Sequence, residues 1–230
     1  TISDMENALF KGHTEIKSVI IPEGYEVISR EAFKDCTSLE RVEIASSVMY
    51  ISTYAFEGCT ALKEVVFNEG LTGIAAYAFD GCTALGDITL PSSTVAVGAY
   101  AFRNTSMDGA TFICKGNAVF DTWALAESGF KTVQFLGNCD LSIDAVLAYA
   151  KVENLTIGEG TEVLGSNFAS TDFGETTPLT VSLPESLKEI RDGAFSQREG
   201  LTEIDLKNVE VIGEDAFSYT GLRELMIPGT

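Results

Sequence analysis

The chain has 230 residues, of which 45% are hydrophobic and 21% are charged, a balance that excludes disorder through low hydrophobicity and high charge. Its 34 acidic and 15 basic residues give a formal net charge of −19, so nucleic acids and anionic membrane surfaces are not expected partners. No apolar run reaches the roughly 18–20 residues of a membrane span, and no membrane insertion is expected.

A repeat runs along the whole chain. Three segments are nearly superimposable: REAFKDCTSLERVEI (30–44), TYAFEGCTALKEVVF (53–67) and AYAFDGCTALGDITL (76–90). We take the aromatic residue of each Ala-Phe pair as the anchor of a unit. The equivalent positions are Phe10, Phe33, Phe56, Phe79, Phe102, Leu125, Val146, Phe168, Phe195 and Phe217. About ten repeats of 21–27 residues therefore tile the chain, and we expect one domain over 1–230.

Each unit predicts the same elements in the same order. Apolar residues at positions −5, −1, 0, +3 and +6 from the anchor have the spacing of one face of a short helix. Two alternating apolar positions follow and predict a short strand with one buried face. In chain order these strand pairs are Val42/Ile44, Val65/Phe67, Ile88/Leu90, Val133/Phe135, Leu155/Ile157, Ile204/Leu206 and Leu225/Ile227. Proline ends the predicted strand at Pro22, Pro91, Pro184 and Pro228.

Stacked units bury a core that no single unit can bury alone. Strands that recur in the same direction pair in parallel about 4.8 Å apart, so ten of them predict a curved body on the order of 45 Å long. The run ISREAFKDCTSLERVEI (28–44) and its copies resemble the BspA-type leucine-rich repeats of bacterial cell-surface proteins. The resemblance implies an α/β fold, a right-handed leucine-rich-repeat solenoid with a parallel sheet on the concave face and short helices or 3₁₀ turns on the convex face.

The resemblance also implies a function. Members are mostly secreted or cell-surface proteins, and some are implicated in adhesion. The expected role is a non-catalytic, extracellular protein-binding or adhesion module with an acidic concave surface, whose partner is a protein or glycan of host matrix or of another cell. The alternative is a structural spacer, an array segment of a larger surface protein with no ligand of its own. The start within a short first unit and the end just after a strand favour a fragment of a longer surface protein.

The five cysteines fall into two groups. Cys36, Cys59 and Cys82 share position +3 and are expected to stack as buried, unbonded thiols. Cys114 and Cys139 lie at different phases of neighbouring units, and the sequence leaves open whether they are bonded. The single histidine, His13, also occupies position +3 and is expected to pack or cap.

Catalytic, metal-binding and cofactor-binding residues are not predicted. The sequence contains no C-x-x-C motif, no cluster of cysteine and histidine and no phosphate-binding glycine motif. An enzyme is therefore not expected.

Two surfaces are candidate binding sites. On the concave face, the residue between the two apolar strand positions points away from the core. These candidates are Glu43, Thr89, Thr111, Gln134, Thr156, Ser182 and Asp205. A merely solvated sheet face is the alternative, because threonine favours strands in any case.

The second candidate surface is an aromatic row at position −2. It contains Tyr54, Tyr77, Tyr100 and Trp123, each 23 residues apart, whereas Glu31, Asp144, Gly193 and Asp215 occupy this position in other units. A helical wheel places position −2 on the outward, convex side. Aromatic residues are enriched at interfaces, so the row is either a contact surface or a stack of rings that covers the turns.

Overall fold

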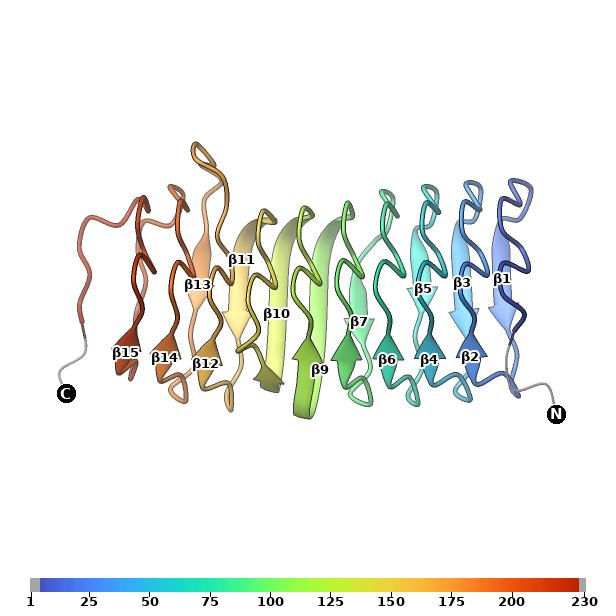
Figure 1. Ribbon diagram of the computed structural model, residues 1–230, viewed down its shortest axis with the longest axis horizontal. Coiled ribbons are helices and arrows are strands. Elements are labelled where there is room, and N and C mark those ends of the chain that lie inside the picture. The colour runs from blue at the N-terminus through green and yellow to red at the C-terminus, as the bar shows by residue number, and fades with distance from the viewer. Residues whose placement is uncertain (1–4, 228–230) are drawn as a thin grey trace.

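A row of parallel strands runs along the molecule, which Figure 1 shows as an elongated, nearly straight stack. The stack has about eight turns. This computed structural model describes residues 5–227, and Pro228 lies outside the described residues. The first row consists of β1 (Ser18–Ile21), β3 (Arg41–Ile44), β5 (Glu64–Val66), β7 (Ile88–Leu90), β9 (Ser106–Phe120), β10 (Gly129–Asp140), β11 (Lys151–Ile157) and β13 (Thr180–Ser182). Neighbours in the row pair in parallel, except that β5 and β7 belong to different sheets.

A second row of short strands, which the sequence did not predict, follows the first in each turn. It consists of β2 (Val27–Ile28), β4 (Tyr50–Ile51), β6 (Gly73–Ile74), β8 (Ala96–Val97), β12 (Val163–Leu164), β14 (Glu189–Ile190) and β15 (Val211–Ile212). These strands contain the apolar position −5, as at Ile28, Ile51 and Ile74. These strands pair in parallel, so the side chains at position −5 line a second side of the core.

The strands β9 and β10 are long because they continue from the first row into the second. Neither contains a proline, the residue that follows β7 at Pro91 and cannot donate a ladder hydrogen bond. Their pairing shifts register between Gly137 and Cys139, which marks a β-bulge. Gly137 has φ of 84°, and a Cβ there would clash with the carbonyl oxygen of Cys114.

The helices expected around each Ala-Phe pair are wrong, because the described residues form tight turns there instead. The N–H of Phe56 donates to the carbonyl of Ala78 in the next turn (2.8 Å) and the N–H of Phe79 donates to Ala101 (2.8 Å). These bonds consume donors that a helix would use within itself. Left-handed residues flank the anchor, as at Tyr77 (φ 59°) and Gly81 (φ 74°).

The expected number of repeats and two expected anchors are also corrected. The predicted strands at Ile204/Leu206 and Leu225/Ile227 do not form, so the first row has eight strands instead of ten. Asp205 shows the competing local structure, because its Oδ1 accepts the N–H of Lys207 (3.1 Å).

The register of the two weakest repeats is shifted by one residue. Leu125 donates its N–H to Val146, and Leu147 donates its N–H to Phe168 (3.0 and 2.8 Å). The anchors are therefore Leu147 and Ala169, one residue after the predicted Val146 and Phe168. Position −2 of the first of these turns is consequently Ala145 and not Asp144.

The core contains two ladders in register. Phe10, Phe33, Phe56, Phe79 and Phe102 stack with centroids 5.1–5.3 Å apart. Beside them the fully buried Cys36, Cys59 and Cys82 donate their thiol hydrogens to the anchor carbonyl of the preceding turn (3.0, 3.1 and 3.2 Å). The predicted ladder of buried, unbonded thiols is confirmed.

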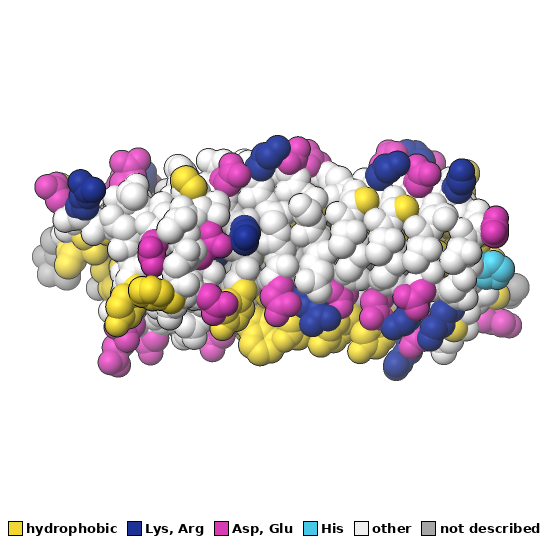
Figure 2. All heavy atoms as spheres, turned by 90° about the horizontal axis from the view of Figure 1, so that it is seen from above, with side chains coloured by type: hydrophobic (Ala, Val, Ile, Leu, Met, Phe, Trp, Pro, Cys, Tyr) yellow, Lys and Arg dark blue, Asp and Glu magenta, His cyan; other side chains and the backbone are white. Residues whose placement is uncertain are grey.

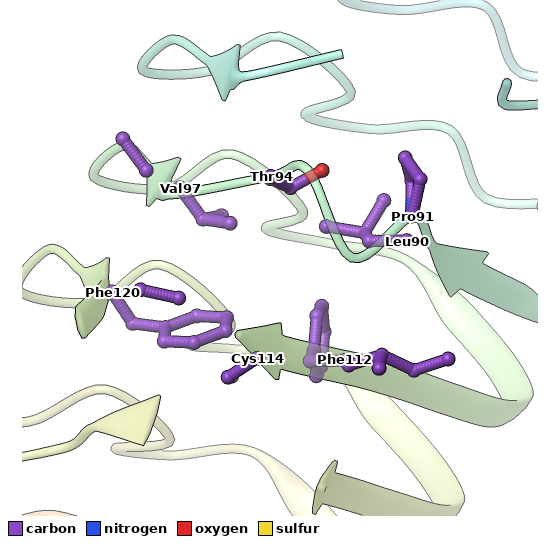
Figure 3. Close-up of a pocket in the computed structure, with 10 residues that line it drawn as sticks. Leu90, Pro91, Thr94, Val97, Phe112, Cys114 and Phe120 are labelled. Carbon is purple, nitrogen blue, oxygen red and sulfur yellow. The ribbon is translucent and has the colours of Figure 1, made fainter. Parts of the chain in front are cut away.

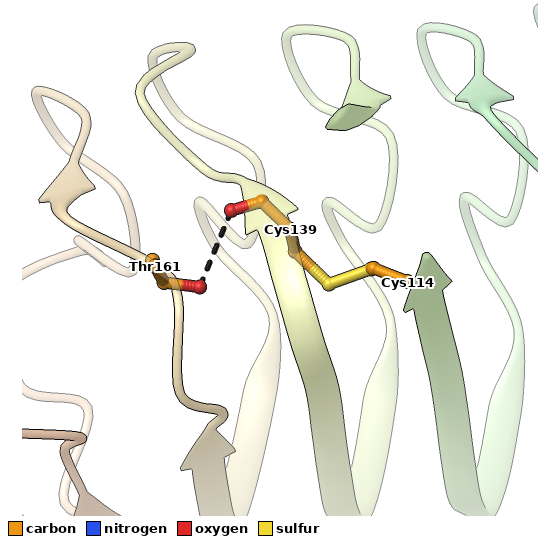
Figure 4. The surroundings of a disulfide bond; sticks show 3 residues. All are labelled: Cys114, Cys139 and Thr161. Carbon is orange, nitrogen blue, oxygen red and sulfur yellow. Dashed lines mark hydrogen bonds between the residues drawn. A yellow bond between two sulfur atoms is a disulfide. The ribbon is translucent and has the colours of Figure 1, made fainter. Parts of the chain in front are cut away.

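A disulfide joins Cys114 on β9 to Cys139 on β10, with Cα atoms 5.3 Å apart (Figure 4). The two residues come together because both strands extend past the corner between the two rows. The buried Thr161 of the following turn donates its hydroxyl hydrogen to the carbonyl of Cys139 (3.2 Å).

Arg198 is a fully buried arginine at position +3, where earlier turns have cysteine. Its Nε donates to the carbonyl of Ala169 (2.5 Å) and its Nη2 to that of Ala150 (2.6 Å), while Nη1 has no partner within residues 5–227. Burial lowers the pKa of this guanidinium to about 10. The long side chain occupies space next to the small residues of the preceding turns, and its hydrogens satisfy their carbonyl groups.

Candidate functional site

The outward side chains of the first row form a continuous polar line across five strands, which we call the outer strand face. Thr89 pairs with Thr111, Thr111 with Gln134, Gln134 with Thr156, and Thr156 with Ser182. Thr111 and Gln134 lie within hydrogen-bond distance of each other (Oγ1 to Oε1, 3.4 Å). These five predicted residues are exposed or half-exposed, so the line offers hydroxyl and amide groups to solvent.

The two acidic residues predicted for this face lie apart from that line. Glu43 is exposed on β3, between Ile20 and Val66, in a sheet that is not paired with β7. Arg41 forms ion pairs with both Glu43 (3.4 Å) and Glu64, which offsets part of the acidic charge. Asp205 is exposed but lies outside the strands, so it does not belong to the paired row in which it was expected.

The aromatic row at position −2 is a stack of half-exposed rings. Tyr54 and Tyr77 lie 5.2 Å apart, Tyr77 and Tyr100 5.0 Å, and Tyr100 and Trp123 5.1 Å between centroids. Figure 2 shows hydrophobic side chains gathered along one long edge of the molecule, among acidic and basic ones. The three tyrosines therefore stack on one another, as one of the two interpretations predicted, and Trp123 is tilted by 47° against the last of them. All four side chains remain partly exposed to solvent.

All four rings stand on left-handed backbone. Their φ angles are between 56° and 63°, a conformation that costs a residue with a side chain about 1–2 kcal/mol. Position −2 thus points outward as predicted, although a left-handed turn and not a helix puts it there.

Basic side chains that the sequence interpretation missed lie against the row. Arg30 and Lys34 lie over Tyr54 (5.5 and 5.1 Å to the centroid), and Arg103 lies over Tyr77 and Tyr100 (5.3 and 5.0 Å). Two of these basic residues could have been found from the repeat, because Lys34 and Arg103 both directly follow an anchor phenylalanine.

Arg103 is fixed in place by a two-point ion pair. Its Nε and Nη2 donate to the carboxylate of the buried Asp80 (3.1 and 2.6 Å). Donation of these hydrogen bonds to Asp80 raises the pKa of the guanidinium. A bidentate pair of this kind orients the cation over the rings.

Two cavities lie near the long strands β9 and β10. A cavity of about 10 Å³ lies between Leu90, Phe112 and Phe120 (Figure 3), which is room for about one water molecule. A polar groove of about 370 Å³ lies beside Asp140 and Arg191. Both side chains bond Ser142: Asp140 Oδ1 accepts its hydroxyl hydrogen (2.6 Å), and Arg191 Nη1 donates to its carbonyl (2.9 Å).

Residues 5–227 contain no group of three or more His, Cys, Asp and Glu side chains arranged to hold a metal ion. No helix that could cross a bilayer is found in the same range.

The stacked parallel turns define a leucine-rich-repeat solenoid. The family model described as the BspA type leucine rich repeat region matches residues 3–131 and 148–230, with six copies. The chain belongs to the BspA-type leucine-rich repeat family, a class of repeat proteins that typically bind other proteins and are typically not enzymes. No curated protein sequence matches the chain.

The chain is similar to several solved bacterial structures at low identity. A leucine-rich repeat protein of Eubacterium ventriosum is 20% identical with a TM-score of 0.51, and the match covers 91% of this chain and 60% of that one. The pneumococcal vaccine antigen PcpA is 17% identical (TM-score 0.48; 91% of this chain and 70% of that one). A leucine rich cell surface protein of Faecalibacterium prausnitzii is 18% identical (TM-score 0.39; 88% and 70%). The chain thus spans less than two thirds of the Eubacterium protein.

Proposed function

We propose that this solenoid is a non-catalytic, extracellular adhesion module, part of a larger surface protein, that binds a protein or glycan on its outer strand face. The observation that carries the proposal is the continuous line of Thr89, Thr111, Gln134, Thr156 and Ser182 across paired strands. Hydroxyl and amide groups on a rigid sheet can donate and accept hydrogen bonds at fixed spacing, which suits an extended polar ligand. Membership of a family typical of bacterial surface proteins supports the extracellular location.

The test is binding of the purified chain to a panel of matrix proteins and glycans at low and high salt. Thr111→Lys places a long charged side chain in the middle of the polar line and should weaken a saturable interaction at least about tenfold, since central contacts dominate binding energy. Thr83→Lys is the matched control, because Thr83 is an exposed threonine in a turn outside the strands and the substitution adds the same charge.

Equal binding by the wild type and Thr111→Lys would overturn the assignment of the ligand to this face. If no member of the panel binds, the spacer role is favoured over the adhesion role.

A further inference from the structure

Trp123 is the last ring of the aromatic row, and one face of its indole has no ring beside it within the described residues. Tyr100 lies on the other side, with its ring tilted by 47° and its centroid 5.1 Å away. In the next turn the equivalent position is Ala145, whose single methyl group cannot continue the stack. Trp123 is 38% exposed, and the three tyrosines of the row are less exposed than it is.

The chain places a cation over each tyrosine of the row but none over Trp123 among residues 5–227. Arg103, one residue after its anchor, lies over the rings of Tyr77 and Tyr100. The corresponding residue in the turn of Trp123 is Ala126. Tryptophan binds cations more strongly than tyrosine does, so the ring best suited to a cation is the one that lacks it.

Exposed carboxylates lie in the turn of Trp123 and in the next turn. Asp121 and Glu127 flank Trp123 in the same turn, and Asp144 precedes Ala145, whose carbonyl accepts the N–H of Trp123 (3.2 Å). Glu127 also lies close enough to Tyr100 to act with burial, the larger cause, in raising the pKa of that hydroxyl. The nearest basic residue of the row, Arg103, is already paired with Asp80.

We propose that Trp123 is the contact point for a basic segment of a partner protein, with an arginine or lysine side chain lying on the uncovered face of the indole. Asp121, Glu127 and Asp144 stabilise the positive charge around it, and the net charge of −19 attracts such a segment from solution. A glutamate-rich or neutral segment offers nothing to this ring. The inference rests on the proposed role as a binding module but concerns a different face of the solenoid.

Trp123 is the only tryptophan of the chain, so its fluorescence reports directly on this site. Titration with an eight-residue arginine peptide should change the emission saturably, and eight-residue glutamate and Gly-Ser peptides should not. Binding of a dye-labelled arginine peptide, followed by anisotropy, should weaken at least about fivefold in Trp123→Ala, as expected for loss of a cation–π contact. Glu127→Gln should weaken it about twofold to threefold.

Two further variants keep the test decisive. Ala126→Arg places a cation next to Trp123 at the position of Arg103, and should weaken peptide binding while the tryptophan stays in place. Tyr54→Ala is the matched control at the other end of the row, where Arg30 and Lys34 already lie over the ring, and should leave peptide binding unchanged.

The inference is overturned if the arginine peptide does not bind at low salt, or if it binds with equal affinity to the wild type, Trp123→Ala and Ala126→Arg. Equal affinity would mean that the general negative charge holds the peptide. Either result leaves the test of the outer strand face intact, because that test uses Thr111→Lys and other ligands.

Discussion

Replacement of Phe79 by alanine tests the stacked core at its centre. Phe79 is fully buried, and its ring contacts Phe56 (5.1 Å), Phe102 (5.2 Å) and, edge-on, Phe67 (6.0 Å). Large-to-small changes of this type cost about 3–5 kcal/mol. Because three rings lose a partner, each contact contributing about 0.5–1.5 kcal/mol beyond its area, we expect about 4 kcal/mol, near the middle of that range.

Urea unfolding followed by circular dichroism and by Trp123 fluorescence measures this loss. With a slope of about 2–3 kcal/mol per M, the midpoint should fall by about 1.5 M. Phe217→Ala is the matched control, because Phe217 is partly exposed and, among residues 5–227, stacks on one ring (Phe195, 5.7 Å); it should lose about 1–2 kcal/mol. A loss below about 1 kcal/mol for Phe79→Ala, or equal losses for both variants, would refute the stacked core.

Three further outcomes are expected. Removal of the disulfide by Cys114→Ser with Cys139→Ser should lower the free energy of unfolding by about 3.5 kcal/mol, the loop entropy for a separation of 25 residues; a thermal midpoint equal to that of the oxidised wild type would contradict this. Burial raises the pKa of Cys59 to about 12 and that of Cys82 well above its ordinary value, so the unfolded chain loses protons above about pH 9 that the folded chain retains. Stability should therefore fall above that pH by about 1.4 kcal/mol per pH unit for each thiol, and a flat urea midpoint from pH 9 to 11 would be evidence against it. Arg198→Ala should cost about 3–5 kcal/mol in urea unfolding, whereas Arg198→Met, which fills the same space without charge, should recover most of this loss; equal losses would exclude a packing role.

The fold was predictable where the repeat is regular and less so where it is not. From Phe33 to Leu125 the spacing of 23 residues fixes the inward and outward positions correctly. The shifted anchors at Leu147 and Ala169 were missed because Val146 and Phe168 beside them are also apolar and fully buried. Spacing alone cannot choose between two adjacent apolar residues.

The helices were predicted wrongly for a different reason. A short helix and a left-handed turn can bury the same positions, so the pattern around Phe79 fits both. Hydrogen bonds between neighbouring turns, such as that from Phe79 to Ala101, favour the left-handed turn over the helix. The pattern within one unit does not show these bonds. The disulfide depends in the same way on the length of β9 and β10, since Cys114 and Cys139 meet only because both strands continue around the corner.

Some residues of the candidate sites could likewise be predicted from the sequence, and others could not. The outward direction of Thr111, Gln134 and Thr156 follows from strand alternation. Arg198 was not recognised as buried because an arginine in a turn is normally exposed, yet its place at position +3 was a usable signal, since that position holds buried cysteines elsewhere.

The bond between Cys114 and Cys139 also has a mechanical consequence. In a protein anchored at one end and pulled at the other, tension along the long axis separates the turns one after another, since each is held to the next by backbone hydrogen bonds. The disulfide near the middle of the chain prevents the segment between the two cysteines from extending. The 25 residues of separation extend to about 85 Å at about 3.4 Å per residue, whereas the bridge spans 5.3 Å between Cα atoms. The oxidised chain therefore reaches its limit about 80 Å earlier than the reduced chain. The redox state thus sets the maximum reach of the stretched chain.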